Sequence, residues 1–195
     1  MTVIKNGYKC VLLDPPWPEY GGGKITRGAQ RHYPLMSLKE IKALQVSKLA
    51  DPAGCHLYLW CTNNTLEDAL EVIKAWGFQY KTCITWLKDR KGLGQYFRGT
   101  TEHCLFAVTK KVLPYKIEDG KRCQGVTGFQ AKRTKHSEKP AEMRKMIELV
   151  SYEPRIELFA RQERDGWTCV GNEQSLLNSG SYVYTPDISA LLANL

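Results

Sequence analysis

The residues best suited to chemistry form a short segment, Asp14-Pro15-Pro16-Trp17, which directly follows three apolar residues. Three apolar residues in a row are typical of a strand that is buried on both faces of a parallel sheet. Two prolines end such a strand because they cannot donate ladder hydrogen bonds. Ligands of open α/β sheets bind at the carboxyl ends of the strands. The pattern therefore predicts that Asp14 lies at the edge of a cleft.

These groups suit an exocyclic amino group such as that of adenine, which is a poor nucleophile because its lone pair is delocalised into the ring. The Asp14 carboxylate and the backbone carbonyl of Pro15 or Pro16 can accept the two hydrogens of such an amine. Proline holds its carbonyl rigidly because its φ is fixed, and the Trp17 ring can stack on an extruded base. The arrangement would also serve the amino group of cytosine, and a strand end followed by a core tryptophan is the plainer interpretation.

The elements that must position this segment alternate between strand and helix, which predicts an α/β sheet. After the first strand, further strands are expected at 56–62, 80–87, 102–108, 155–159 and 167–170. Helices are expected at 37–45, at 65–76 and from Pro140 to about Val150. Ser37 and Glu40 have the spacing of a capping box. Loops are expected at 18–34, 88–101 and 109–138, and loops of that length in a small domain favour a function.

Length and composition predict one domain, at 1–173, followed by a tail at 174–195 that is either flexible or docks on a second copy of the chain. A chain of 195 residues suffices for one good core. The N-terminus lacks the apolar core of a signal peptide, and no apolar run reaches membrane-spanning length. We therefore expect a cytoplasmic protein with no membrane partner.

The cysteine and charge patterns indicate which ligands and partners to expect. The seven cysteines are scattered with no Cys-x-x-Cys pair, so reduced core thiols are expected and no metal site. The net charge is +8, and residues 110–135 contain eight basic residues against two acidic ones. Such a segment suits a phosphate backbone, although a solvated face that improves solubility would have the same composition.

Further motifs join the Asp-Pro-Pro-Trp segment in a recognisable order. They are Arg31-His-Tyr-Pro-Leu-Met36, Leu57-Tyr-Leu-Trp60, Ile84-Thr-Trp-Leu-Lys88, Glu102-His-Cys-Leu105, HSEKPAEM from His136, RIELFAR from Arg155, and the final GW and GNE. The chain from about Lys9 to Glu173 thus resembles the MT-A family of adenine amino-group methyltransferases, named after the catalytic subunit of the mRNA adenosine methyltransferase. Two extra residues between His136 and Lys139 resemble its bacterial and phage branch.

The resemblance implies a Rossmann-like methyltransferase fold, with a mostly parallel sheet, helices on both faces and a circular permutation that places the acceptor motif before the cofactor motif. It implies S-adenosylmethionine as the cofactor. The residues at the matching cofactor-binding positions are Asp14, Lys139, Glu157, Phe159, Arg161, Asn172 and Glu173.

Three of these residues also have plainer interpretations. Lys139 would serve as a surface lysine at a helix start, and Phe159 as a core residue. Glu157 would serve as a buried structural carboxylate paired with Arg155 or Arg161.

The resemblance also implies the substrate side. Tyr33 takes the position that lines the acceptor pocket, and we assign Trp17, Glu102, Arg31, Lys88 and Arg98 to substrate binding. Asp14, Pro15, Pro16 and Trp17 are the expected catalytic residues. The expected activity is methylation of the N6 amino group of adenine in nucleic acid, with DNA favoured over RNA. An RNA adenine methyltransferase and a catalytically silent nucleic-acid-binding relative are the alternatives.

Overall fold

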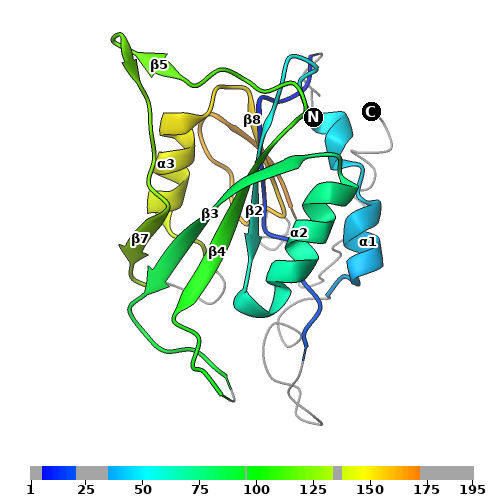
Figure 1. The fold of residues 1–195 in the computed structure, drawn as a ribbon, viewed down its shortest axis with the longest axis vertical. Coiled ribbons are helices and arrows are strands. Elements are labelled where there is room, and N and C mark those ends of the chain that lie inside the picture. Colours follow the sequence, from blue (N-terminus) through cyan, green and yellow to red (C-terminus); the bar gives the residue numbers. More distant parts are fainter. Residues whose placement is uncertain (1–5, 21–34, 95, 134–137, 172–195) are drawn as a thin grey trace.

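A mixed sheet forms the centre of the computed structural model, which describes residues 6–20, 35–94, 96–133 and 138–171 (Figure 1). The seven strands of this sheet lie in the order β7 (Gly128–Ala131), β3 (Gln79–Lys88), β4 (Thr101–Val108), β2 (His56–Cys61), β1 (Cys10–Leu13), β8 (Arg155–Leu158) and β9 (Trp167–Val170). Four of the six strand pairings are parallel, as predicted, and only those of β4 with β2 and β3 are antiparallel.

The register of the parallel strands brings three strand ends together. Leu13, the last residue of β1, pairs with Leu59 of β2 and with Leu158 of β8. The segments that follow these three strands therefore leave the sheet at one edge, where α/β sheets bind ligands. Asp14 directly follows β1 at this edge.

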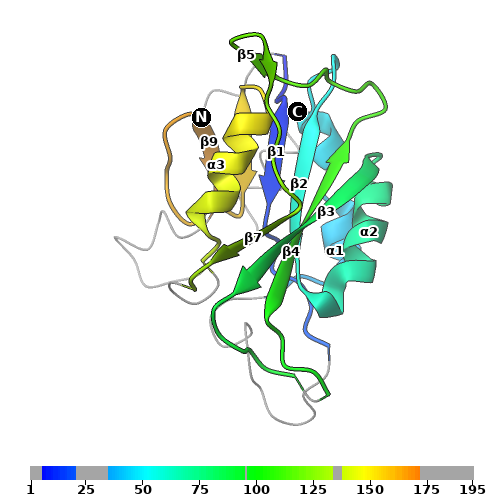
Figure 2. The same ribbon diagram turned by 60° about the vertical axis from the view of Figure 1, so that its left-hand side comes forward.

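Helices cover both faces of the sheet, as predicted (Figures 1 and 2). They are α1 (Leu38–Ala43) and α2 (Leu66–Ala75) on one face, and α3 (Ala141–Val150) on the other. Successive strand residues point to opposite faces, so β1 contributes to two cores. Leu13 packs in the cluster that contains Ile41 of α1, and Leu12 packs in the cluster that contains Ile147 of α3.

The start of α1 follows the predicted capping box. The Ser37 hydroxyl accepts a hydrogen bond from the Glu40 N–H at 3.3 Å, and the Glu40 carboxylate accepts one from the Ser37 N–H at 2.7 Å. This reciprocal pair satisfies two helix N–H groups that have no partner inside the helix. Two short 3-10 helices, η2 (Val46–Leu49) and η3 (Asn63–Thr65), were not predicted.

The segment 109–138 differs from the expected uninterrupted loop, and that prediction was wrong. It contains β7, and it contains a small hairpin of β5 (Ile117–Glu118) and β6 (Lys121–Arg122). The hairpin turn places Asp119 and Gly120 at φ of 50° and 74°, a conformation that these residue types tolerate. The strand β7 is short and pairs with β3, which is distant in sequence. The two strands of the hairpin are shorter still. Strands of this length leave no periodic pattern in the sequence.

The cysteines match the prediction of free thiols. All seven are free, and five of them are buried. In the described part of the chain, no helix combines the length and the apolar character needed to cross a bilayer.

Candidate active site

The Asp14-Pro15-Pro16 segment is fixed by backbone hydrogen bonds at the end of β1. The Trp17 N–H donates to the Pro15 carbonyl at 2.9 Å, and the Met36 N–H donates to the Pro16 carbonyl at 2.9 Å. Both prolines are buried. A carbonyl oxygen has two lone pairs, so each proline carbonyl keeps the capacity for one further hydrogen bond. The segment therefore presents a rigid carbonyl beside the Asp14 carboxylate.

Trp17 lies in the core beneath this segment. Its side chain is 9% exposed and packs in the same cluster as Leu13. Its indole Nε1 donates to the Trp60 carbonyl at 2.8 Å, which ties the segment to the end of β2. This geometry supports a role in positioning Asp14. Stacking of Trp17 on a base stays a prediction, and little of the ring is open to make such a contact.

An alternating chain of charges connects Asp14 to three other strands and loops. The Lys139 ammonium lies 2.7 Å from Asp14 Oδ2 and 2.8 Å from Glu102 Oε1, and the Lys88 ammonium lies 2.7 Å from Glu102 Oε2. The side chains of Lys139 and Glu102 are only 14% and 12% exposed. We call Asp14, Lys139, Glu102 and Lys88 the charge network. It shows that Lys139 is not a surface lysine.

The charge network shifts the pKa of its members in different directions. Burial alone would raise the pKa of Glu102, but Lys139 and Lys88 outweigh it and lower that pKa to about 2. Burial would lower the pKa of Lys139, and the two carboxylates raise it instead. Burial raises the pKa of Asp14 because it exceeds the attraction of Lys139, and the charge of Glu102 raises it further. Of the two carboxylates in the charge network, Asp14 therefore accepts a proton more readily than Glu102.

Aromatic rings border the two ammonium groups. Lys139 Nζ lies 5.4 Å from the centroid of the Trp60 ring, and Lys88 Nζ lies 4.9 Å from that of Trp86. A cation above an indole face is stabilised by the ring quadrupole. The contact of Lys88 with both Trp86 and Glu102 places its charge inside the structure. Its assignment to substrate stays a prediction.

A cavity of about 220 Å³ opens beside Asp14 and Lys139. Five of the residues expected at the cofactor line it, namely Asp14, Lys139, Glu157, Phe159 and Arg161. These residues come from the end of β1, the start of α3 and the end of β8, and only the fold brings them together. The cavity is also lined by Trp60, Met143 and Gln162, which the sequence analysis did not assign.

Glu157 has other partners than those expected. Its Oε2 atom lies 3.7 Å from Arg144 Nε and 3.9 Å from Arg164 Nε, whereas Arg155 pairs with Glu153. The distances to Arg144 and Arg164 exceed those of a hydrogen bond. Within the described residues, Glu157 Oε2 and both Nε atoms are buried without a hydrogen-bond partner. Buried polar atoms that lack a partner call for an explanation, and a bound ligand or a water molecule would supply the missing bonds.

Phe159 directly follows β8 and has an uncommon backbone conformation. Its φ is 62°, in the left-handed region that side-chain-bearing residues rarely adopt. Such conformations cluster at ligand-binding sites. Its ring is 6% exposed and belongs to the core, so the structure supports the core interpretation while the residue also lines the cavity.

Of the five remaining expected residues, the structure describes Arg98 alone. Arg31, Tyr33, Asn172 and Glu173 lie outside the described residues. Arg98 is exposed on the loop between β3 and β4, where its Nε donates to the Gly92 carbonyl.

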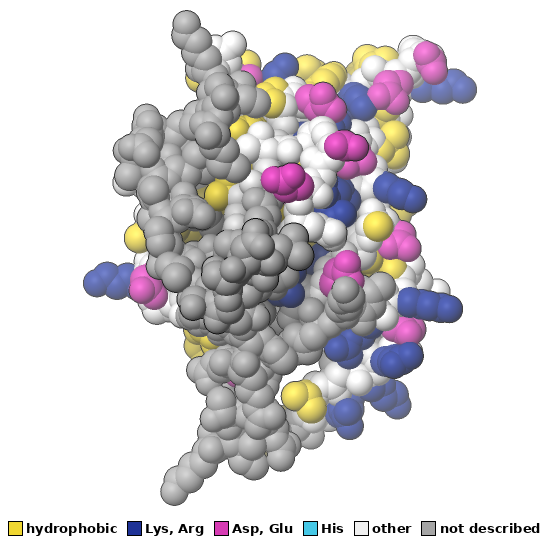
Figure 3. All heavy atoms as spheres, turned by 180° about the vertical axis from the view of Figure 1, so that it is seen from behind, with side chains coloured by type: hydrophobic (Ala, Val, Ile, Leu, Met, Phe, Trp, Pro, Cys, Tyr) yellow, Lys and Arg dark blue, Asp and Glu magenta, His cyan; other side chains and the backbone are white. Residues whose placement is uncertain are grey.

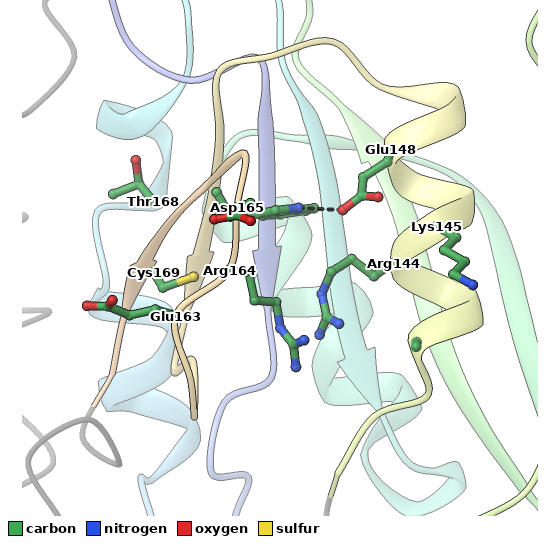
Figure 4. Close-up of a pocket in the computed structure, with 10 residues that line it drawn as sticks. Arg144, Lys145, Glu148, Glu163, Arg164, Asp165, Thr168 and Cys169 are labelled. Carbon is green, nitrogen blue, oxygen red and sulfur yellow. Dashed lines mark hydrogen bonds between the residues drawn. The ribbon is translucent and has the colours of Figure 1, made fainter. Parts of the chain in front are cut away.

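A second and larger cavity, of about 710 Å³, lies between α3 and the segment 163–169 (Figure 4). Arg144 and Arg164 line both cavities, and Figure 4 shows their side chains extending side by side. Glu148 accepts a hydrogen bond from the Trp167 indole at 2.8 Å in its wall. The sequence analysis missed Arg144 and Arg164, because their link to Glu157 depends on how α3 and the loop after β8 lie beside that strand.

The mostly parallel sheet with helices on both faces is that of a Rossmann-like methyltransferase fold. The sequence matches the MT-A70 family over residues 8–173, and the chain belongs to this family. It is 32% identical to the Type II methyltransferase M.MunI of Mycoplasma sp over 87% of this chain and 78% of that protein.

Two eukaryotic relatives match over a smaller part of their length. The chain is 28% identical to the human N(6)-adenosine-methyltransferase catalytic subunit METTL3, over 96% of this chain and 31% of that protein. It is 30% identical to the N(6)-adenosine-methyltransferase MT-A70-like protein of Drosophila melanogaster, over 89% of this chain and 28% of that protein. The circular permutation stays a prediction.

Proposed function

We propose that this chain transfers a methyl group from S-adenosylmethionine to the N6 amino group of adenine in DNA. The observation that carries the proposal is the position of Asp14. Its carboxylate directly follows β1, lies at the cavity and is held by Lys139 at 2.7 Å. The names of the relatives support adenine as the acceptor. DNA follows from the resemblance to the bacterial and phage branch, and the long match to a Type II methyltransferase agrees with it.

The residues around the smaller cavity fit the proposed cofactor. An ammonium has three N–H donors, and Lys139 uses two of them on Asp14 and Glu102. The third can bind the carboxylate of the methionine part. Glu157 Oε2 is buried without a hydrogen-bond partner among the described residues, so it can accept a hydrogen bond from a ribose hydroxyl. Arg161 lines the same cavity. When bound, S-adenosylmethionine supplies a methyl group that is already electrophilic on its sulfonium.

The protein groups then act mainly on the amine. The Asp14 carboxylate accepts one N–H of adenine, and the free lone pair of a proline carbonyl accepts the other. These two acceptors orient the nitrogen and hold its lone pair toward the methyl donor, which is catalysis by position. The raised pKa of Asp14 favours uptake of the proton that the amine loses.

Methyl transfer from labelled cofactor to matched DNA and RNA oligonucleotides, followed by nucleoside analysis, tests the proposal. We expect N6-methyladenine in DNA. Asp14→Asn keeps the shape of the side chain but removes its charge, and we expect a loss of at least about 100-fold in turnover. Asp119→Asn is the matched control, since Asp119 is exposed in the β5–β6 turn.

Three outcomes would contradict the proposal. Label in cytosine would refute adenine as the methyl acceptor, and label confined to RNA would refute DNA as the substrate. Undiminished turnover by Asp14→Asn would overturn the role of the carboxylate.

A further inference from the structure

The loop 89–100 between β3 and β4 is a folded projection rather than an open connection. The Lys88 N–H donates to the Thr100 carbonyl at 2.8 Å, and the Gly92 N–H donates to the Gly99 carbonyl at 2.6 Å. At the end of the loop, a Cβ on Gly94 would lie 1.8 Å from the Phe97 carbonyl oxygen. Only glycine allows so close an approach, so the backbones of Gly94 and Phe97 lie against each other at the tip.

This tip exposes its apolar side chains almost completely. Leu93, Tyr96 and Phe97 are 70%, 94% and 90% exposed. The exposed Tyr115 differs, because the Arg122 guanidinium covers its ring at 3.6 Å. Adjacent exposed apolar groups mark a surface that binds a partner. We call Leu93, Tyr96 and Phe97 the apolar tip.

The charges beside the apolar tip favour a nucleic acid as that partner. Arg90, Lys91 and Arg98 are exposed on the same loop. Asp89 is the loop's one acidic residue, and its carboxylate faces Arg90 at 3.6 Å and accepts the Arg133 N–H at 2.9 Å. Cations around flat apolar rings match a polymer of phosphates and bases. More Lys and Arg side chains gather along the edge of the molecule on the side of α3 and β7 (Figure 3).

The root of the loop lies in the charge network. Lys88 is the last residue of β3, and Glu102 is the second residue of β4. These two residues face each other at 2.7 Å, and Glu102 is joined through Lys139 to Asp14. The apolar tip is therefore carried by a short, hydrogen-bonded loop that starts and ends at the proposed catalytic centre.

We propose that the apolar tip inserts into duplex DNA beside the target adenine and takes over its stacking contacts while the base is outside the helix. This inference rests on the proposed function. An adenine inside a duplex must leave the stack before Asp14 can reach its amino group. Apolar side chains that enter between base pairs compensate part of the unstacking. Arg90, Lys91 and Arg98 then contact the phosphates on either side.

The test compares two duplexes that differ only opposite the target adenine. One has the normal thymine, and the other has an abasic site, which leaves the adenine already unpaired. We expect the double variant Tyr96→Ser, Phe97→Ser to lose about 30-fold in kcat/KM on the paired duplex, because each base–aromatic contact contributes about 5-fold or more. On the abasic duplex we expect a loss below about 3-fold. Val112→Ser, at a residue 54% exposed in another loop, is the control.

Each other outcome overturns the insertion. Equal losses on both duplexes would mean that the apolar tip only strengthens binding, and no loss on either would mean that it does not touch DNA. Loss of a dimer in sedimentation, with both activities kept, would assign the tip to a second copy of the chain. Methylation of single strands alone would overturn the insertion but leave the methyl transfer intact. Absence of methylation by the unmodified protein would overturn the proposed function itself.

Discussion

The two ends of the parallel strands carry two buried polar clusters of different character. At the amino ends, the Ser151 hydroxyl lies 2.9 Å from both His56 Nδ1 and the Tyr58 hydroxyl. His56 and Ser151 are 5% and 0% exposed, and neither lines either of the two cavities. At the carboxyl ends, the charge network consists of ion pairs, and Asp14 and Lys139 border the smaller cavity.

This difference indicates that the cluster at the amino ends serves stability and that the charge network serves function. In the cluster at the amino ends, which we call the Ser151 cluster, the hydroxyl and ring groups satisfy one another, so it needs no ligand and holds β2 to the segment after α3. In the charge network, Lys139 keeps a third donor, and nearby Glu157 Oε2 has no hydrogen-bond partner among the described residues. Groups that are buried but incompletely bonded are typical of binding sites.

The strongest way to test this separation is Lys139→Met. The change removes the cation shared by Asp14 and Glu102 and leaves their two carboxylates without it. We expect turnover to fall by at least about 1000-fold, because both the orientation of Asp14 and the proposed cofactor contact are lost. Single-turnover methylation measures the effect. Lys39→Met, at an exposed position of α1, is the control.

A loss of stability in Lys139→Met without a loss of turnover would contradict the separation. Circular dichroism and thermal unfolding of the same samples report whether the fold is kept, so a merely unfolded variant is recognised.

At the amino ends of the strands, acidification should lower the stability of the fold through the Ser151 cluster. Burial lowers the pKa of His56 from 6.5 to about 4. Between these values the unfolded chain binds a proton that the folded chain does not, so stability falls as pH decreases from 6.5 to 4. The loss from this residue is about 3 kcal/mol. Urea unfolding at several pH values measures it, and His56→Asn, whose amide can replace Nδ1, should flatten this part of the curve. An unchanged slope in His56→Asn would show that other groups cause it.

Glu102→Gln sharpens the comparison inside the charge network. Burial raises the pKa of Asp14, and the charge of Glu102 adds to it. Without the charge of Glu102, Lys139 pairs with Asp14 alone and stabilises its ionised form more strongly. The pKa of Asp14 should therefore fall. We expect about 30-fold lower kcat and an acidic limb of the pH–rate profile that moves to lower pH. Glu118→Gln, in the exposed hairpin, is the control. A limb that moves to higher pH would exclude this coupling.

Sequence reasoning singled out the members of this network but not how they pair with one another. Asp14 and Lys139 lie in recognisable motifs, and the strand at 167–170 and the capping box at Ser37 were predicted correctly. The assignment of Glu102 to substrate stays a prediction, and the sequence did not show that its carboxylate holds two lysines from different segments. Such partners depend on β4 lying beside β2 and β3, a pairing between residues far apart in sequence.

The partners of Glu157 also could not be predicted from the sequence. The expected partners were arginines close in sequence, whereas the observed ones are Arg144 of α3 and Arg164 of a loop. A helix face predicts which residues are buried, and Met143 and Ile147 are. It does not predict that Arg144, one residue beyond Met143, turns its guanidinium toward β8.

The smallest expected effect belongs to Lys88, which touches neither cavity. Among the residues that the structure describes, its ammonium contacts the second oxygen of Glu102 and the face of Trp86. Lys88→Gln should therefore lower kcat by about 5-fold and leave KM for DNA within about 2-fold, as expected of a positioning residue. A lysine that binds phosphate would behave differently, because its loss raises KM and flattens the salt dependence of binding. Arg98→Gln provides that contrast in the same assay. If Lys88→Gln changes KM and the salt dependence as Arg98→Gln does, Lys88 belongs to the DNA surface and the charge network ends at Glu102.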